Sequence, residues 1–344
     1  MSTLLRMHVL LLHVLLLLTL TNGLIFNTTP NVDHLVVLSH GIMGTGEDLG
    51  YLASLLETSG CTTLRSVSNE DRKSLDGVKA GGEKLASEIL GCIARNSQLK
   101  RLSVVGNSLG GLYMRYAMKL LFDDSDGTVG GLQPHRFMSI ATPHLGVRDW
   151  TFVDDNGLQV PDILKVLVSK AMFSTGRDLF GITEDETGDE SLLFQMATDE
   201  SFLKPLRVFG ARRLYANLRN DLVVPLGTAA FMNQQQVKKL RTEHEGNSGI
   251  VTVVKTPSEK MVIGLTSFPN TSFKNKNDHK TNIMIDQLDR LGWDKVIVNF
   301  SGVLPIAHNK ICALSREPKW LYEDVLGFNA GQFVMKDAST WLSE

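Results

Sequence analysis

The chain has 344 residues, of which 43% are hydrophobic and 21% are charged, and its formal net charge is -2 at pH 7. This hydrophobic content is sufficient for a sizeable core, and the near-neutral charge with both signs interspersed gives no reason to expect a nucleic-acid partner. The chain has three cysteines, Cys61, Cys92 and Cys312, which are too few for a cluster of metal ligands or a dense disulfide framework. At most one disulfide could form, and Cys61 and Cys92 are the nearest pair in sequence.

The N-terminus differs in composition from the rest of the chain. Arg6 precedes a leucine-rich run from Met7 to Leu20, and the small residues that follow suit a cleavage site. We therefore predict that residues 1–23 form a secretory signal peptide. A retained membrane anchor is the alternative, because Leu24–Phe26 extends the run towards the roughly 20 residues of a membrane span. Either form directs the chain to the secretory pathway, as an endoplasmic reticulum or a secreted protein. The remaining alternative is a buried N-terminal helix.

Strand and helix patterns alternate in the region before residue 100. A nearly continuous apolar run at His34–Ser39 is typical of a buried parallel strand, and Thr62–Val67 is a second predicted strand. Apolar residues at helical spacing predict helices at Asp48–Leu56 and Lys79–Ile93. This alternation predicts an α/β fold with a mostly parallel sheet covered by helices on both faces.

A serine follows at a sharp turn between the next strand and helix. Ser108 is the central residue of a G-x-S-x-G motif that comes after the strand-like Arg101–Val105, and small flanking residues let the chain turn sharply enough to expose the serine oxygen. Arg115 and Lys119 are predicted on the solvent side of the helix. Its apolar face is predicted to contain Leu109, Leu112, Tyr113, Tyr116, Ala117 and Leu120. We expect Ser108 to be a nucleophile; a turn with an idle serine is the alternative.

The next segment combines one strand with an irregular region. Phe137–Ala141 is predicted as a strand, and its loop Thr142–Gly146 is expected near the serine, at the carboxyl edge of the sheet. From about residue 147 to 203 the alternation stops, which predicts an insertion above the sheet. This insertion is expected to be either a lid or acyl-chain wall over the active site, or a helix packed on the body for stability.

The remaining chain returns to alternating elements. The predicted elements are a strand at Leu206–Ala216, a hairpin of Gly249–Val254 and Met261–Leu265, a helix at Thr281–Leu291, a strand at Lys295–Phe300 and a C-terminal helix at Lys319–Leu342. Four residues are expected to anchor the last helix on the sheet: Trp320, Leu321, Phe333 and Trp341.

The order of acidic residues and histidines after Ser108 indicates which of them could form a catalytic triad with it. A serine hydroxyl needs a histidine base, which needs an acidic residue, and α/β hydrolases carry these groups in the order serine, acid, histidine. Asp221 follows a predicted strand and is the candidate acid. Of the histidines downstream of it, His308 alone follows a buried strand and is the candidate base.

The oxyanion hole is predicted to consist of two backbone N–H groups, those of Ile42, in a glycine-rich loop, and of Leu109. Nothing in the sequence calls for a metal or an organic cofactor.

Several segments together resemble a known family. These are HLVVLSHGIMG, VGNSLGGLYMRYA, ATPHLG, TGRDLF, LYANLRNDLVVP and the stretch from LGWDKVIVNF to AHNKI. They resemble the eukaryotic "putative serine esterase" family of lipase-like α/β hydrolases, over most of the chain from His34 to beyond His308. The resemblance implies a lipase or carboxylesterase fold and activity on acyl esters of lipids. We therefore expect one α/β-hydrolase domain over residues 24–344, which contains the insertion at about 147–203. It also implies Ser108 as nucleophile, Asp221 as acid and His308 as base.

Fold and triad leave the acyl substrate open. The expected reaction is cleavage of carboxylic esters of acylglycerols or phospholipids through an acyl-enzyme, and the expected partners are a lipid ester and a membrane or lipid surface. The same three residues would also serve an amidase, peptidase or thioesterase. Two further alternatives are a catalytically silent hydrolase scaffold that binds a lipid or protein partner, and a membrane-anchored structural protein.

Overall fold

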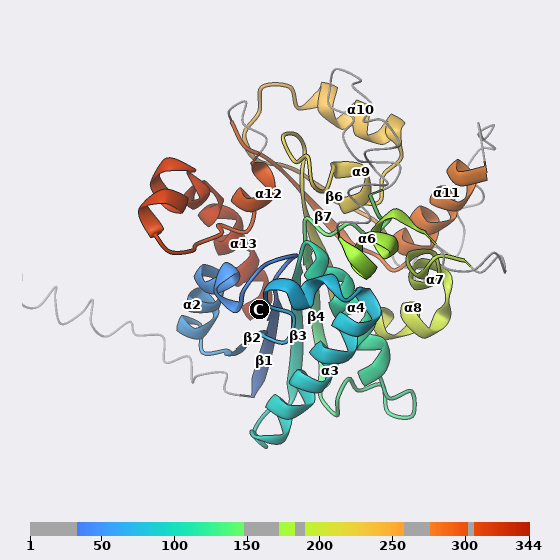
Figure 1. The fold of residues 1–344 in the computed structure, drawn as a ribbon, viewed down its shortest axis with the longest axis vertical. Helices are drawn as coiled ribbons and strands as arrows, with labels where there is room; N and C mark the ends of the chain where they lie inside the picture. Colours follow the sequence, from blue (N-terminus) through green and yellow to red (C-terminus); the bar gives the residue numbers. More distant parts are fainter. Residues whose placement is uncertain (1–32, 148–171, 183–189, 258–275, 302–305) are drawn as a thin grey trace, which may run out of the picture.

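The computed structural model describes residues 33–147, 172–182, 190–257, 276–301 and 306–344 (Figure 1). The predicted signal peptide or anchor lies outside these residues, as do most of the predicted insertion and the second strand of the predicted hairpin. Within the described residues, we find no helix that is both long and apolar enough to cross a membrane.

The described strands form one seven-stranded sheet in the order β2-β1-β3-β4-β5-β7-β6. All neighbours are parallel except β6, which is antiparallel to β7 at the edge of the sheet. The strands are β1 (His34–Ser39), β2 (Thr62–Arg65), β3 (Arg101–Asn107), β4 (Gln133–Ile140), β5 (Ala211–Asn217), β6 (Gly249–Lys255) and β7 (Asp294–Asn299). This mostly parallel sheet has the predicted α/β-hydrolase architecture. The described partner of β6 is β7, whereas the hairpin partner predicted at Met261–Leu265 lies outside the described residues.

Helices cover both faces of the sheet. Figure 1 shows α2 and α13 on one side and α3, α4 and α8 on the other. The α-helices are α2 (Gly50–Thr58), α3 (Val78–Ala94), α4 (Leu109–Leu121), α6 (Phe173–Phe180), α7 (Leu192–Thr198), α8 (Glu200–Arg207), α9 (Leu226–Ala229), α10 (Gln234–Glu243), α11 (Lys276–Asp289), α12 (Ala307–Lys310) and α13 (Gln332–Ser343). Short 3-10 turns include η1 (Gly46–Leu49) and η2 (Asp71–Leu75), and a π-helical turn spans Trp320–Val325.

Alternation along the strands divides the core into two halves. In β1, Leu35 and Val37 belong to the hydrophobic cluster under α3 and α4, whereas Val36 and Leu38 belong to the cluster under α2 and α13. Successive side chains of a strand point to opposite faces, so an uninterrupted apolar run is needed where both faces are covered. This is why the continuous apolar run correctly predicted a buried parallel strand.

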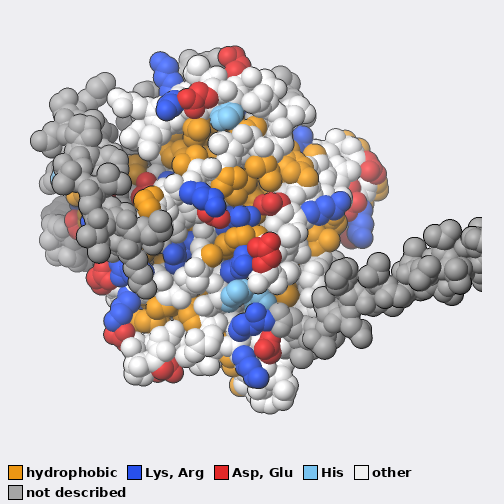
Figure 2. Space-filling model, turned by 180° about the vertical axis from the view of Figure 1, so that it is seen from behind, with side chains coloured by type: hydrophobic (Ala, Val, Ile, Leu, Met, Phe, Trp, Pro, Cys, Tyr) orange, Lys and Arg blue, Asp and Glu red, His pale blue; other side chains and the backbone are white. Residues whose placement is uncertain are grey.

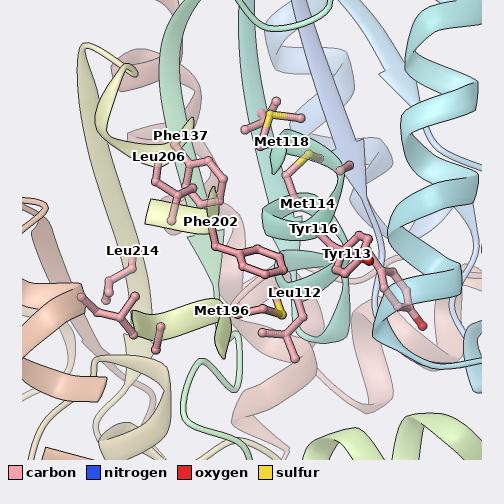
Figure 3. Packing of buried hydrophobic residues seen from close by; sticks show 14 of the residues in the cluster. Leu112, Tyr113, Met114, Tyr116, Met118, Phe137, Met196, Phe202, Leu206 and Leu214 are labelled. Atoms are coloured by element: carbon pink, nitrogen blue, oxygen red, sulfur yellow. The ribbon is translucent and has the colours of Figure 1, made fainter. Parts of the chain in front are cut away.

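Helix α4 is buried more completely than its sequence pattern predicts. Its side chains pack against α8 and the sheet (Figure 3), and even Arg115 is fully buried, whereas Leu120 is 47% exposed. The prediction of a solvent face at Arg115 was therefore wrong. Helix α3 approaches α4 so closely that a Cβ on Gly81 would lie 2.2 Å from the ring of Tyr113. With neighbours on most sides, this helix has little surface left for charged residues.

Two other sequence predictions need correction. The strand expected from Leu206 begins only at Ala211, because Leu206 and Arg207 belong to α8. The predicted C-terminal helix is broken, because α13 begins only at Gln332. Trp320 is 61% exposed and does not anchor it, whereas Phe333 is 37% exposed with its ring 5.8 Å from that of Phe300. Trp341 is buried as predicted, and the other buried residues of α13 are Val334, Met335, Ala338, Ser339 and Leu342.

The structure shows the state of the cysteines and the distribution of the charged side chains. The three cysteines, Cys61, Cys92 and Cys312, are free thiols, so the one pairing that the sequence left open does not form in this structure. Acidic and basic side chains are interspersed over the face shown in Figure 2, as expected for a chain with a formal net charge of -2.

Candidate active site

Ser108 occupies a strained turn between β3 and α4. Its φ is 55° and its ψ is -128°, a conformation that costs a non-glycine residue about 1–3 kcal/mol. The turn brings backbone segments so close together that only glycine fits at the flanking positions. A Cβ on Gly106 would lie 2.3 Å from the Cα of Gly111. A Cβ on Gly110 would lie 2.3 Å from the carbonyl oxygen of Ser39. The glycines of the motif therefore allow the backbone approach that holds the serine at the carboxyl edge of the sheet.

His308 bonds both of the other predicted residues. Its Nε2 lies 3.0 Å from Ser108 Oγ, and its Nδ1 lies 3.0 Å from Asp221 Oδ2. A carboxylate only accepts hydrogen bonds, so Nδ1 carries a proton, and in the neutral ring Nε2 accepts from the serine. The structure thus brings together the three residues selected from the sequence, with His308 in the short helix α12.

Four donors surround the carboxylate of Asp221. Besides His308, Asn217 donates its Nδ2–H to Oδ2 at 2.7 Å. The N–H groups of Val223 and Val224 donate to Oδ1 at 3.1 and 2.8 Å. The Asp221 side chain is 1% exposed and that of His308 11% exposed. These donors compensate the burial of the carboxylate and fix its orientation.

The backbone also ties the acid to the histidine. Asp221 forms an isolated antiparallel bridge with Ile306, and the N–H of Ala307 donates to the carbonyl of Asn220 at 3.1 Å. The segment just before His308 is therefore attached to the segment just before Asp221. Sequence reasoning missed Asn217, although a polar amide at the end of a strand, four residues before a candidate acid, is a recognisable signal.

The glycine-rich loop after β1 lies directly against the serine. A Cβ on Gly41 would be 2.8 Å from Ser108 Cβ and 3.3 Å from its Oγ, so only glycine fits here. Ile42 is the next residue. Leu109 is the first residue of α4, and the first N–H groups of a helix have no intrahelical acceptor. The two predicted oxyanion donors thus lie in segments that border the serine.

The loop after β4 completes the carboxyl edge near the serine, as predicted. The N–H of Ser108 donates to the carbonyl of Ile140 at 2.7 Å, and the Thr142 hydroxyl donates to the carbonyl of Gly106 at 3.3 Å.

Among the residues that the structure describes, no group of three or more His, Cys, Asp or Glu side chains could hold a metal ion.

Comparison with protein families gives a direct match. Residues 29–235 match the family described as "Putative serine esterase (DUF676)". The chain belongs to this family. The match includes Ser108 and Asp221 but ends before His308, so it is shorter than the resemblance noted in the sequence, and the position of His308 rests on the geometry described above.

Two yeast proteins are similar to this chain in sequence. The protein named "Putative lipase ROG1" from Saccharomyces cerevisiae is 30% identical over 245 residues, which cover 67% of this chain and 34% of that protein. The "Putative lipase C4A8.10" from Schizosaccharomyces pombe is 30% identical over 212 residues, covering 58% of this chain and 26% of that protein. The aligned part of this chain thus spans between about a quarter and a third of these relatives' length.

Comparison with solved structures finds lipases that match this chain at low sequence identity and low TM-score. A monoacylglycerol lipase from Paleococcus ferrophilus is 13% identical, with a TM-score of 0.39 over 90% of this chain and 93% of that chain. Lipase B from Aspergillus fumigatus is 15% identical, with a TM-score of 0.38 over 60% of this chain and 43% of that chain.

Proposed function

We propose that this member of the serine esterase family hydrolyses carboxylic esters of lipids through Ser108, His308 and Asp221. The observation that carries the proposal is the continuous hydrogen-bonded series from Ser108 Oγ through His308 to Asp221, with both contacts at 3.0 Å. This arrangement matches the requirements of nucleophilic catalysis: a serine at a strained turn, a base within reach of its proton and a buried acid that fixes the base.

The proposed reaction has two steps. His308 Nε2 takes the proton of Ser108 Oγ as the oxygen attacks the ester carbonyl, and the N–H groups of Ile42 and Leu109 stabilise the oxyanion. The protonated His308 then gives its proton to the leaving alcohol, which leaves an acyl group on Ser108. In the second step His308 removes a proton from water, the hydroxide attacks the acyl carbonyl, and Ser108 recovers its proton as the acid departs.

Apolar side chains next to the site support a lipid ester as the substrate. Met43 follows the proposed oxyanion donor and is 45% exposed, and Leu222 and Val223, next to Asp221, are 39% and 50% exposed. Exposed apolar groups around a site provide contacts for an acyl chain or a lipid surface. The yeast relatives with the printed name "putative lipase" support the same substrate class.

An active-site probe tests the proposed nucleophile. Purified protein is incubated with a fluorophosphonate, and the labelled peptide is mapped in the wild type and in His308→Ala. We expect label on Ser108 that His308→Ala loses, because the serine is activated by its base. Absence of label on folded wild-type protein would contradict the proposal and favour a catalytically silent binding scaffold.

A substrate screen then tests the reaction class. Rates are measured on lipid esters, thioesters and amides with matched acyl chains. We expect the highest kcat/KM on lipid esters. A higher kcat/KM on thioesters or amides would replace the esterase with a thioesterase or amidase that uses the same three residues.

A further inference from the structure

Met43, in the loop beside the serine, has a strained backbone. The N–H of Gly44 donates to the carbonyl of Gly41 at 3.2 Å, which closes a four-residue turn with Met43 at its third position. Its φ is 50°, in the left-handed region that type II turns require and that glycine adopts most readily. Because the Met43 side chain is 45% exposed, side-chain packing does little to hold this conformation. Contacts to its backbone must hold it instead.

The first set of contacts comes from η2. Ser74 Oγ accepts a hydrogen bond from the Met43 N–H at 2.9 Å, and the N–H of Asp71 donates to the Gly44 carbonyl at 3.1 Å. Ser74 is fully buried and donates its own hydroxyl proton to the carbonyl of Asp71, so its orientation is fixed. In the alternative type I turn, the peptide group between Ile42 and Met43 is rotated. The contact with Ser74 opposes that rotation.

The second set of contacts comes from the C-terminal part of the chain, downstream of α12. Arg316 Nη2 donates to the Met43 carbonyl at 3.3 Å. The same guanidinium makes two hydrogen bonds to the carboxylate of Asp48, both 2.7 Å long, and the Asp48 side chain is 3% exposed. A Cβ on Gly44 would lie 2.7 Å from Asp48 Oδ2, so the carboxylate also lies against the loop. A bidentate pair of this kind is geometrically specific.

We propose that Ser74 and the Arg316–Asp48 pair hold the two peptide groups of Met43 from opposite ends and thereby position the Ile42 N–H towards Ser108. We call these three residues the Met43 clamp. Ile42 lies between Met43 and Gly41, on which a Cβ would lie 2.8 Å from Ser108 Cβ. We therefore expect relaxation of Met43 to a negative φ to displace the Ile42 N–H from the developing oxyanion. The three residues are positioning residues, and this inference rests on the proposed function.

Ser74→Ala is the sharpest single test of the clamp. The substitution removes only the side-chain hydroxyl. Tyr113 and Thr175 donate to the main-chain carbonyl of Ser74, at 2.7 and 2.8 Å, and those contacts remain. We expect kcat on the preferred ester to fall by about 10- to 100-fold with KM changed less than about threefold, because an oxyanion donor acts mainly in the transition state. Arg316→Met is expected to act in the same direction.

Matched controls separate positioning from a general loss of packing. Ser103→Ala removes another buried serine hydroxyl. Its Oγ forms a hydrogen bond of 2.8 Å with His34 Nε2 at the amino edge of the sheet. Arg213→Met removes another half-buried arginine paired with acids, Asp294 and Asp337. Both controls are expected to keep the wild-type kcat, with Tm recorded for every variant.

A rescue variant adds a readout that a purely structural role would not change. Glycine adopts a positive φ without strain, so Met43→Gly in the Ser74→Ala background should recover part of the lost kcat. The clamp is overturned if wild type is active and Ser74→Ala keeps its kcat, or if Ser74→Ala loses no more than Ser103→Ala. A wild type that neither hydrolyses esters nor reacts with fluorophosphonate overturns the proposed function, and the catalytic role of the clamp with it.

Discussion

Two serine–histidine hydrogen bonds lie at opposite edges of the sheet and have different surroundings. At the carboxyl edge, His308 bonds Ser108 and, through its other nitrogen, Asp221. At the amino edge, His34 bonds Ser103 at 2.8 Å, but its other nitrogen faces the Cys61 thiol at 3.7 Å. His34 is fully buried, and burial lowers its pKa to about 4. A short serine–histidine distance is therefore insufficient for catalysis, because the base also needs an acid and access to substrate.

A third serine–histidine contact shows a different use of histidine. His144 Nε2 lies 2.9 Å from Ser139 Oγ, and Arg115 approaches its Nδ1 to 3.3 Å. Arginine only donates, so Nδ1 accepts and Nε2 carries the proton. Burial first, and then the nearby charges of Arg115 and Lys295, hold the pKa of His144 well below its usual value. This histidine is a neutral hydrogen-bonding group of the core, whereas the role proposed for His308 requires it to accept and release a proton.

The largest expected effect separates the three serines. Ser108→Ala should lower kcat by about 10⁴- to 10⁶-fold, because it removes the proposed nucleophile. Ser103→Ala and Ser139→Ala should keep the wild-type kcat per folded molecule. Steady-state kinetics with circular dichroism on all three variants checks this. Loss of kcat in folded Ser103→Ala or Ser139→Ala would contradict the distinction between the sites.

The acid should matter almost as much as the serine. Asp221→Asn places an amide where His308 needs a carboxylate, which favours the wrong tautomer, and we expect kcat to fall by about 10⁴-fold. Asp337→Asn is the matched control, since Asp337 accepts a hydrogen bond from Tyr215 at 2.6 Å away from the serine. The control should lower Tm and leave kcat unchanged. If the kcat of Asp221→Asn stays within about tenfold of the wild-type kcat, Asp221 has no essential role in the mechanism.

His34 should affect stability rather than activity. Its pKa is about 4 in the folded protein against 6.5 in the unfolded chain, so the unfolded chain binds the proton more tightly. This contribution to stability is fully present above pH 6.5 and is lost as the pH falls towards 4, by about 3 kcal/mol in total. Urea unfolding between pH 8 and 4 should show a shallower decline for His34→Gln. An unchanged slope in that variant would refute the assignment. His144 contributes in the same direction, so some slope should remain.

The smallest effect concerns the buried arginine of α4. Arg115→Met leaves His144 Nδ1 and the carbonyl of Met196 without their donor, which we expect to lower the free energy of unfolding by about 2 kcal/mol. Lys119→Met, on the same helix and above the ring of Phe202 at 4.0 Å, is the matched control and should change it by less than about 1 kcal/mol. Denaturant unfolding measures both, and equal stabilities would show that the buried guanidinium is dispensable.

Much of the fold was determined by local sequence patterns. The apolar run of β1, the glycines around Ser108 and the order of serine, acid and histidine predicted the parallel sheet, the turn at the serine and the three residues that the structure brings together. These features were readable because burial on both faces of a strand and a sharp turn place demands on neighbouring residues.

Only the tertiary structure decided which polar side chains support the site. Arg316 reaches Asp48 across 268 residues, and Ser74 reaches Met43 across 31, so no periodicity connects them. Arg115 has the spacing of a solvent-facing residue, yet it is buried by helices that come from other parts of the chain. Hydrogen-bond direction and helix burial depend on how distant segments meet, and a local pattern contains no information about that meeting.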